Sequence, residues 1–219
     1  MINIIYEDNH LLIVEKPINI PVQGDDSKDL DLLTMLKNFI KERDNKQGNV
    51  YLGLVHRLDR PVGGIMVFAK TSKCASRLSE QVRNRTLKKT YYAIVEGKVE
   101  EKDILKDYLL KDTKTNIVKV DKNGKEAILD YKLIEYKKDY SLVKINLKTG
   151  RSHQIRVQFS SREHALYGDQ KYNKNAKVGE QIALFAKELE LIHPIKKELI
   201  KFSIDLKDKY PWNMFKKDS

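Results

Sequence analysis

Residues 125–150, KEAILDYKLIEYKKDYSLVKINLKTG, place the strongest constraint on the fold. The segment contains two long stretches that are rich in apolar and β-branched residues, and the short polar stretch 137–139 separates them. Such a pattern predicts two strands joined by a tight turn, and strands joined in this way pair antiparallel. The fold should therefore be built on hairpin-linked antiparallel strands.

The remaining segments add helices and further strands. Apolar residues at helical spacing predict helices over residues 31–45 and 71–84, and the second can be capped by Thr71 or Ser72. Apolar residues on both faces of 88–99 predict a central, covered strand. We expect residues 103–121 to form a charged excursion or edge hairpin. The sequence VYLGLV should be a strand, RSHQIRVQFSSRE a helix that starts at Ser152, and QIALFAKELEL and LIKFSIDL late strands. No alternating βα pattern appears, so the chain is assigned to the α+β class.

The charge balance favours a polyanionic partner. The chain has 42 Lys plus Arg against 31 Asp plus Glu, a formal charge of +11, and nucleic acid is the commonest polyanion that such proteins bind. The one cysteine, Cys74, cannot form an intrachain disulfide, which favours a reducing compartment. No run approaches the roughly 20 apolar residues of a membrane helix. We expect a cytoplasmic protein without a membrane partner.

The pentapeptide HRLDR places one carboxylate, Asp59, between Arg57 and Arg60. Taken alone, this pattern favours a structural ion pair. Its position favours chemistry, because it follows an apolar stretch and precedes a Pro-Val-Gly-Gly turn, and reactive groups are often placed on such junctions. Nearby cations also favour the ionised form that a carboxylate nucleophile requires.

The stretch TGRSHQIR concentrates hydrogen-bond donors in six residues, namely Arg151, His153, Gln154 and Arg156. One interpretation is a solvated basic helix face. However, Ile155 and Val157 interrupt the polar run, so some of these groups should point inward, and an inward arginine needs an anionic partner.

Tyr91 lies in the strand predicted over 88–99. It is either a core tyrosine with a satisfied hydroxyl or a ring that stacks on an unpaired base. Other chemistries fit poorly. The five histidines lack ligand spacing and no CxxC occurs, so we expect no metal, and Cys74 should be a packing residue.

Five stretches in order resemble the RluA family of pseudouridine synthases: IIYEDNHLLIVEKP, HRLDRPVGGIMVFAK, KKTYYAIVEG, LKTGRSHQIRV and YGDQKY. Two positions depart from the family pattern, since Pro61 follows HRLDR and Ser152 replaces the commoner threonine. The resemblance implies the pseudouridine synthase fold: a mixed, mostly antiparallel β-sheet with flanking helices and a central active-site cleft. It also implies one catalytic domain over residues 1–219, without an S4 RNA-binding domain.

The resemblance further implies isomerisation of uridine to pseudouridine in RNA, either rRNA or tRNA, without a cofactor. Asp59 falls on the catalytic nucleophile, Tyr91 on the tyrosine that stacks on the target base, and Arg156 on the arginine that pairs with that aspartate. Arg57 matches an arginine that occupies the space of the flipped nucleotide. The resemblance and the surrounding charge give the set of RNA-binding residues: Arg57, Arg60, Arg151, His153 and Gln154.

Two alternatives remain beside this enzyme, which we expect to be a monomer. One is a non-catalytic RNA-binding or chaperone module on the same fold. The other is a carboxylate-dependent glycosidase, a chemistry that needs two carboxylates near one bond. Only Asp59 lies in a matched motif, and Asp169 fits better as a turn residue or structural partner.

Overall fold

The computed structural model describes residues 2–25 and 27–215. Its contacts divide the chain into two compact units, Met1–Lys88 with Glu188–Ile204 (unit 1) and Lys89–Lys187 with Asp205–Ser219 (unit 2). Strand β10, Leu184–Ile192, contributes its first four residues to unit 2 and the rest to unit 1. The single domain over residues 1–219 and the central cleft stay predictions.

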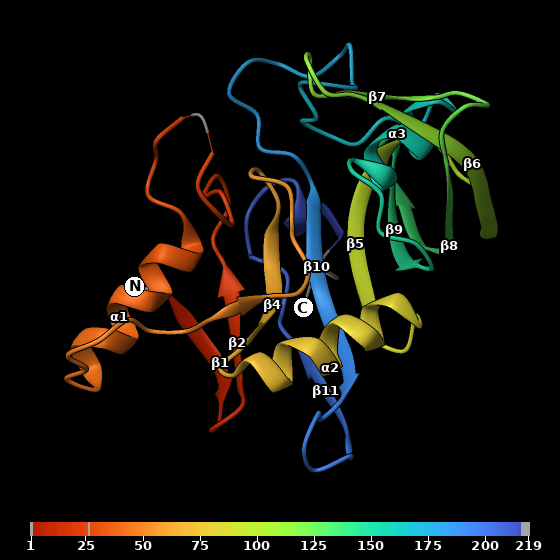
Figure 1. Cartoon of the computed structure of the whole chain (residues 1–219). Coiled ribbons are helices and arrows are strands. Elements are labelled where there is room, and N and C mark those ends of the chain that lie inside the picture. The colour runs from red at the N-terminus through yellow and green to blue at the C-terminus, as the bar shows by residue number, and fades with distance from the viewer. Residues whose placement is uncertain (1, 26, 216–219) are drawn as a thin grey trace. The chain divides into compact units, whose positions relative to one another are not determined.

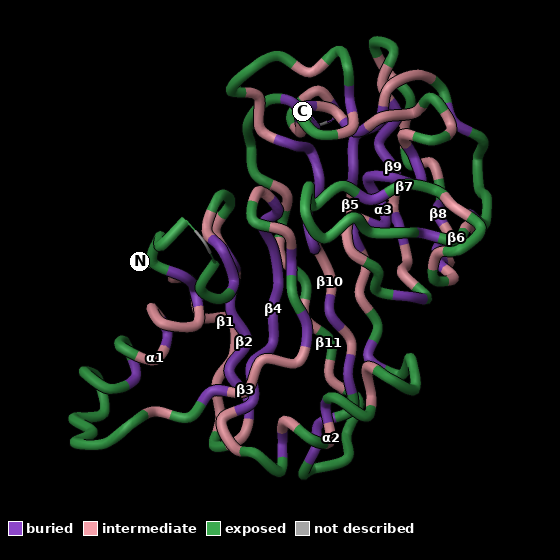
Figure 2. Tube along the Cα trace, turned by 45° about the horizontal axis from the view of Figure 1, so that its top comes forward, coloured by how far each residue is buried: buried purple, intermediate pink, exposed green. Residues whose placement is uncertain are grey.

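Unit 1 is a sheet with a helix packed on it (Figure 1). Its strands follow the order β1-β2-β4-β10, with β3 paired to β4 and β11 to β10. The bounds are β1 Asn3–Glu7, β2 Leu11–Lys16, β3 Gly53–Leu54, β4 Gly63–Ala69 and β11 Leu199–Ser203. All seven residues of β4 are buried (Figure 2), as expected for an apolar strand covered on both faces.

Two long helices belong to unit 1 and match the predicted ones. Helix α1 spans Leu32–Arg43, and the Asp31 side chain caps its first turn. Helix α2 spans Ser72–Arg83, and the Thr71 hydroxyl accepts from the Cys74 amide as its N-cap. Cys74 is fully buried in the core with Leu78, and burial raises the pKa of its thiol to about 11, which confirms a packing residue.

Unit 2 is a sheet with strand order β10-β5-β9-β8-β6-β7, in which the pairs from β5 to β7 are antiparallel. The bounds are β5 Lys88–Glu96, β6 Lys102–Asp112, β7 Ile117–Val120, β8 Lys125–Lys137 and β9 Tyr140–Leu147. The β8–β9 hairpin confirms the constraint read from residues 125–150. Its two turn residues, Lys138 and Asp139, both have positive φ, at 52° and 60°, the geometry of a type I′ turn. The Tyr136 hydroxyl donates to the Asp139 carboxylate at 2.9 Å and stabilises the turn.

Helix α3, Gln154–Ser160, and a 3₁₀ helix, Trp212–Phe215, complete unit 2. Val157 of α3 packs on Leu109, Val118 and Ala127 of the β6–β8 strands. The predicted start at Ser152 is wrong, because His153 adopts a left-handed conformation with φ 51° and the helix begins after it. The predicted strand VYLGLV is also wrong apart from the two residues of β3.

The class prediction is confirmed: the fold is α+β, with a mixed, mostly antiparallel sheet and flanking helices. Every strand pair whose register is given is antiparallel. Residues 103–121 form the β6–β7 hairpin at the sheet edge, and β5 lies between β9 and β10, as predicted. Within the described residues, no helix has the length and apolar character needed to cross a membrane.

Candidate active site

One buried lysine fixes the backbone of the HRLDR loop. Lys16 ends β2 and is 1% exposed. Its Nζ donates to the carbonyl oxygens of Pro17 at 2.8 Å, Arg60 at 3.0 Å and Val62 at 2.8 Å. The Val62 amide in turn donates to the Asp59 carbonyl at 2.9 Å, which closes the turn after the aspartate. The loop that carries Asp59 is therefore held at fixed points in unit 1.

Burial and two neighbouring charges determine the pKa of Lys16. Burial lowers the pKa of Lys16 to about 7, the negative charge of Asp59 opposes this shift, and the Arg60 guanidinium adds to it. The three carbonyl acceptors match the three N–H donors of an ammonium group, so the protonated form satisfies all three. Lys16 is not among the site residues predicted from the sequence, although the KP pair that contains it was a visible signal.

The HRLDR loop alternates inward and outward residues. His56 and Leu58 are buried, Asp59 is half-buried and Arg57 is exposed. The His56 Nε2 accepts a hydrogen bond from the Val67 amide of β4 at 3.1 Å, so in its neutral form the ring carries its proton on Nδ1. The histidine of HRLDR thus ties the loop to the sheet, whereas Arg57 is exposed and Asp59 half-buried.

Arg60 differs from Arg57 in its contacts. Its guanidinium pairs with the Asp29 carboxylate and donates to the Ser27 hydroxyl at 3.0 Å, and Asp25 lies 3.9 Å away. These contacts tie the HRLDR loop to the loop before α1. The predicted role of Arg60 in RNA binding stays a prediction beside these contacts with the protein's own loop.

In unit 2, Arg156 forms a buried ion pair with Asp169. Its Nε donates to one carboxylate oxygen at 2.8 Å and its Nη2 to the other at 2.6 Å, and the two side chains are 7% and 0% exposed. Asp169 also accepts from the backbone amides of Lys171 and Tyr172. The prediction that an inward arginine would have an anionic partner is confirmed, as is the structural role of Asp169.

A tyrosine that the sequence analysis missed connects Arg156 to His153. The Arg156 guanidinium lies 5.1 Å from the centre of the Tyr172 ring, a cation–π contact. The Tyr172 hydroxyl accepts from the Val118 amide at 2.9 Å and lies 2.7 Å from the His153 Nδ1. The His153 ring is half-buried, and its tautomer decides which of the two side chains donates in this hydrogen bond.

The TGRSHQ segment is shaped by internal hydrogen bonds. The Gln154 Oε1 accepts from the Thr149 hydroxyl at 2.8 Å and from the Arg151 amide at 3.0 Å, and Gln154 is 3% exposed. Gln154 was predicted to bind RNA, and this role stays a prediction; its Oε1 is used by the loop, and its side chain is buried. Arg151 is exposed, and the side-chain hydrogen bond given for it within the described residues runs from Nε to the Glu126 carbonyl.

Tyr91 lies in β5 opposite Ile145 of β9 and is 5% exposed. The residue two positions earlier on the same strand face, Lys89, has a pKa lowered by burial. The strand thus places an aromatic ring and a desolvated cation side by side.

The structure gathers the candidate residues into two groups. Unit 1 contains Asp59, Arg57 and Arg60. Unit 2 contains Tyr91 and Arg156, and also the predicted RNA-binding residues Arg151, His153 and Gln154. Each group is described within its own unit, so the pairing of Arg156 with Asp59 stays a prediction. In the described part of the chain, no three His, Cys, Asp or Glu side chains are grouped to hold a metal ion.

Comparison with known proteins places this chain in a family. A family model described as RNA pseudouridylate synthase matches residues 10–161, a range that contains Asp59, Tyr91 and Arg156. An uncharacterized RNA pseudouridine synthase of Bacillus subtilis is 34% identical over 91% of this chain and 67% of its own length. Ribosomal large subunit pseudouridine synthase C of Vibrio cholerae is 33% identical over 87% of this chain and 61% of its own length.

A solved structure agrees on the fold. The human RNA pseudouridylate synthase domain containing 4 has a TM-score of 0.78, with 94% of this chain and 88% of that chain covered and 22% identity. On the family match and these relatives, the chain belongs to the RNA pseudouridylate synthases, isomerases that convert uridine to pseudouridine in RNA.

Proposed function

We propose that this chain modifies uridine in the RNA of the large ribosomal subunit, with Asp59 as the nucleophile. The observation that carries the proposal is the HRLDR loop, which presents a half-buried carboxylate on a backbone anchored by Lys16. The ribosomal substrate is supported by relatives named ribosomal large subunit pseudouridine synthase C and D. Ribosomal RNA and the single cysteine favour a cytoplasmic reaction.

The reaction moves the ribose from N1 to C5 of the same uracil. The Asp59 carboxylate adds either to C1′ of the sugar, which releases the uracil with the electrons of the broken bond on N1, or to C6 of the ring. The detached or rotated uracil then turns and C5 bonds to C1′. The bond from Asp59 to the substrate breaks, a base removes the C5 proton, and N1 takes up a proton. No atoms are gained or lost overall, so the chemistry needs no redox partner.

We assign Arg156 and Tyr91 to the same reaction. Asp169 holds the Arg156 guanidinium through Nε and Nη2, and we assign this guanidinium to the Asp59 carboxylate during the reaction. Tyr91 would confine the uracil while it turns. Arg57, Arg151 and His153 remain our candidates for the RNA around the flipped uridine.

The burial of Asp169 argues against the glycosidase alternative. A second catalytic carboxylate has to reach the substrate and exchange protons. Asp169 has no exposed side-chain area and is committed to Arg156 and two backbone amides. Asp59 therefore works without a carboxylate partner from the YGDQKY motif.

Mapping of pseudouridine in cells tests the proposal and the non-catalytic alternative together. Total RNA from cells with and without the gene would be treated with a pseudouridine-specific carbodiimide and read by primer extension. We expect one or more stops in large-subunit rRNA that vanish with the gene. They should return with the wild type and with the surface control Glu101→Gln, and stay absent with Asp59→Asn. Stops restored by Asp59→Asn would refute the role of Asp59, and unchanged rRNA would refute the substrate.

A further inference from the structure

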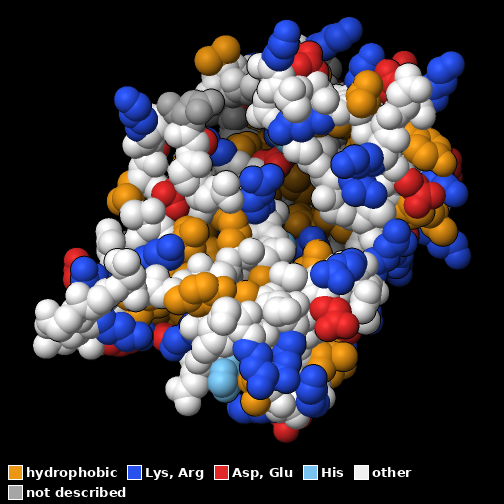
Figure 3. Space-filling view, viewed as in Figure 1, with side chains coloured by type: hydrophobic (Ala, Val, Ile, Leu, Met, Phe, Trp, Pro, Cys, Tyr) orange, Lys and Arg blue, Asp and Glu red, His pale blue; other side chains and the backbone are white. Residues whose placement is uncertain are grey.

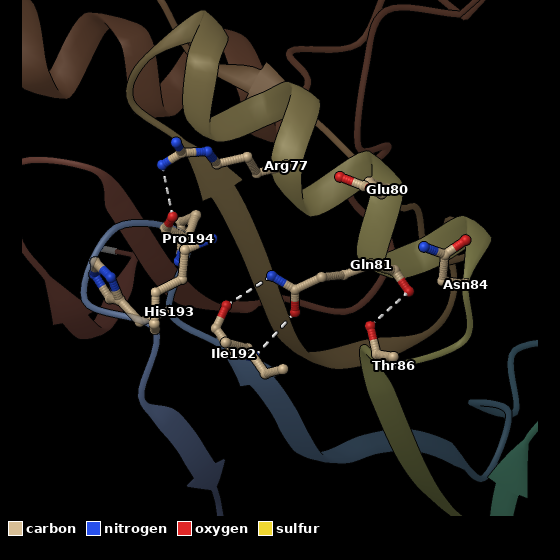
Figure 4. Close-up of a pocket in the computed structure, with 9 residues that line it drawn as sticks. Arg77, Glu80, Gln81, Asn84, Thr86, Ile192, His193 and Pro194 are labelled. Atoms are coloured by element: carbon tan, nitrogen blue, oxygen red, sulfur yellow. Dashed lines mark hydrogen bonds between the residues drawn. The ribbon is translucent and has the colours of Figure 1, made fainter.

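A notch on unit 1 lies between α2 and the β10–β11 hairpin (Figure 4). Helix α2 contributes Arg77, Glu80, Gln81 and Asn84, and the hairpin contributes Ile192, His193, Pro194 and Lys197, with Thr86 at one end. Its volume is about 150 Å³. Small-molecule sites usually measure about 300–1,000 Å³, so this notch fits one group of a larger partner rather than a cofactor.

Hydrogen bonds between α2 and the β10–β11 hairpin fix the two walls of the notch. The Gln81 amide donates to the Ile192 carbonyl at 2.7 Å and accepts from the Ile192 amide at 2.9 Å. The Arg77 Nη1 donates to the Pro194 carbonyl at 2.8 Å. His193 is buried, its Nε2 lies 2.8 Å from the Asp8 carboxylate, and its Nδ1 accepts from the amides of the hairpin turn. The helix and the hairpin are therefore fixed to each other before any partner arrives.

Positive charge surrounds the notch. Residues 71–88 and 190–201 carry eight Lys or Arg (73, 77, 83, 85, 88, 196, 197 and 201) and three Glu (80, 190 and 198), a net charge of +5. Figure 3 shows Lys and Arg side chains gathered over α2 and this hairpin. Glu190 neutralises part of the charge by pairing with Lys88 and Lys201.

The other cations near the notch are available to a partner. The described structure gives no ion pair to Lys73, Arg83 or Lys197, and all three are exposed. Lys73 and Arg77 are four residues apart and so lie on one stripe of α2, about 100° around the helix from the buried Cys74 and Leu78. Arg77 is used on the Pro194 carbonyl, whereas the exposed Lys73 is directed at solvent or at a polyanion.

The notch is separate from the loop of Asp59. The HRLDR loop precedes β4 at Gly63, whereas α2 follows the other end of β4 after Ala69. Six steps of about 3.3 Å along a strand place the two ends about 20 Å apart. A group bound in the notch therefore belongs to a different part of the substrate from the uridine that Asp59 attacks.

We propose that this notch, with Lys73, Arg83 and Lys197 around it, docks the phosphate backbone of the substrate RNA at a point remote from the target uridine. The proposal rests on RNA as the substrate, which supplies a polyanion long enough to span both places. It adds a second contact site that would help select structured RNA, because a short strand at Asp59 would not reach it.

A charge-neutralising variant tests this proposal. The triple variant Lys73→Gln, Arg83→Gln and Lys197→Gln would be compared with the wild type for binding to transcribed large-subunit rRNA between 50 and 300 mM salt. Three lost phosphate contacts should weaken binding at least tenfold and lower the slope of log affinity against log salt by about 2. The turnover number at saturating RNA should stay unchanged, since none of the three residues touches the reacting atoms.

The matched control neutralises three exposed lysines elsewhere, Lys102, Lys132 and Lys138, with the same change in net charge. Glu80→Gln removes the acid that lines the notch and should tighten RNA binding two- to threefold. This variant tests the proposal even if the triple variant fails to fold. Equal losses of RNA affinity in the triple variant and the control would overturn the proposal. Unchanged RNA affinity in both notch variants would also overturn it, and would favour a protein as the partner of the notch. Because binding is measured directly, an inactive wild type would contradict the proposed function alone.

Discussion

Replacing Lys16 with methionine tests whether the anchor of the HRLDR loop serves catalysis. Methionine keeps an unbranched side chain of similar length and removes the ammonium. Three charge-assisted hydrogen bonds contribute about 5–9 kcal/mol in total at roughly 1.5–3 kcal/mol each. Opposing this, the fall of the Lys16 pKa from 10.5 to about 7 corresponds to about 5 kcal/mol of burial cost.

These two contributions nearly cancel, so the free energy of unfolding should fall by no more than a few kcal/mol and the variant should fold. The carbonyl groups of Arg60 and Val62, however, lose the point that positions the turn after Asp59. A displacement of about 1 Å at a reacting group costs on the order of 100-fold in rate, and we expect a loss of that size in kcat/KM.

The assay is pseudouridine formation on transcribed rRNA, with urea unfolding measured on the same samples. Lys70→Met is the matched control. Lys70 follows the far end of β4, where its Nζ binds the Asp8 carbonyl and the Glu7 carboxylate, each at 2.7 Å. The Lys70→Met protein should have a lower free energy of unfolding than the wild type and the same kcat/KM. A folded Lys16→Met protein with kcat/KM within threefold of the wild type would refute the reasoning.

Two further predictions concern ion pairs. Glu7 accepts from Arg43 and Lys70, and the hydrogen bond from Arg43 contributes most to lowering the pKa of Glu7 to about 2. After allowance for solvent screening, Glu7→Gln should lower the free energy of unfolding by about 1–2 kcal/mol at pH 7. The wild type holds this advantage above pH 4.5 and loses it as the pH falls toward 2; urea unfolding curves that stay apart at pH 2 would contradict this. Asp169→Asn removes an anionic partner from buried Arg156 and should cost about 3–5 kcal/mol in urea unfolding, whereas a loss below 1 kcal/mol would show that the pair is dispensable.

Local patterns predicted much of the fold. The apolar periodicity over residues 31–45 and 71–84 gave α1 and α2, and alternation gave the β8–β9 hairpin, because each pattern is complete within its own segment. The start of α3 was missed because His153, which precedes the helix, adopts a left-handed conformation and makes no side-chain cap hydrogen bond. The usual capping rules therefore do not describe this helix start.

The candidate site was only partly predictable for a similar reason. The motifs identified Asp59 and Arg156, but the role of Lys16 depends on carbonyl oxygens 44 and 46 residues away in the chain. The KP pair marks the lysine, but a backbone acceptor has no residue type, so the carbonyl partners of Lys16 could not be predicted from a side-chain pattern. The partner of Arg156 could not be predicted for a related reason. The sequence predicted an anionic partner, but several aspartates could have been that partner, and the structure shows that it is Asp169.

The most direct test of the central claim is the release of tritium from rRNA that is labelled at C5 of uridine. Forming the bond between C5 and C1′ expels the C5 hydrogen, so each isomerisation releases one label. Under single-turnover conditions, the wild type should release the label from its target uridines. Asp59→Asn should release none above background, while it binds the same RNA with an affinity within about threefold of the wild type. Release by Asp59→Asn at a rate close to that of the wild type would contradict the account.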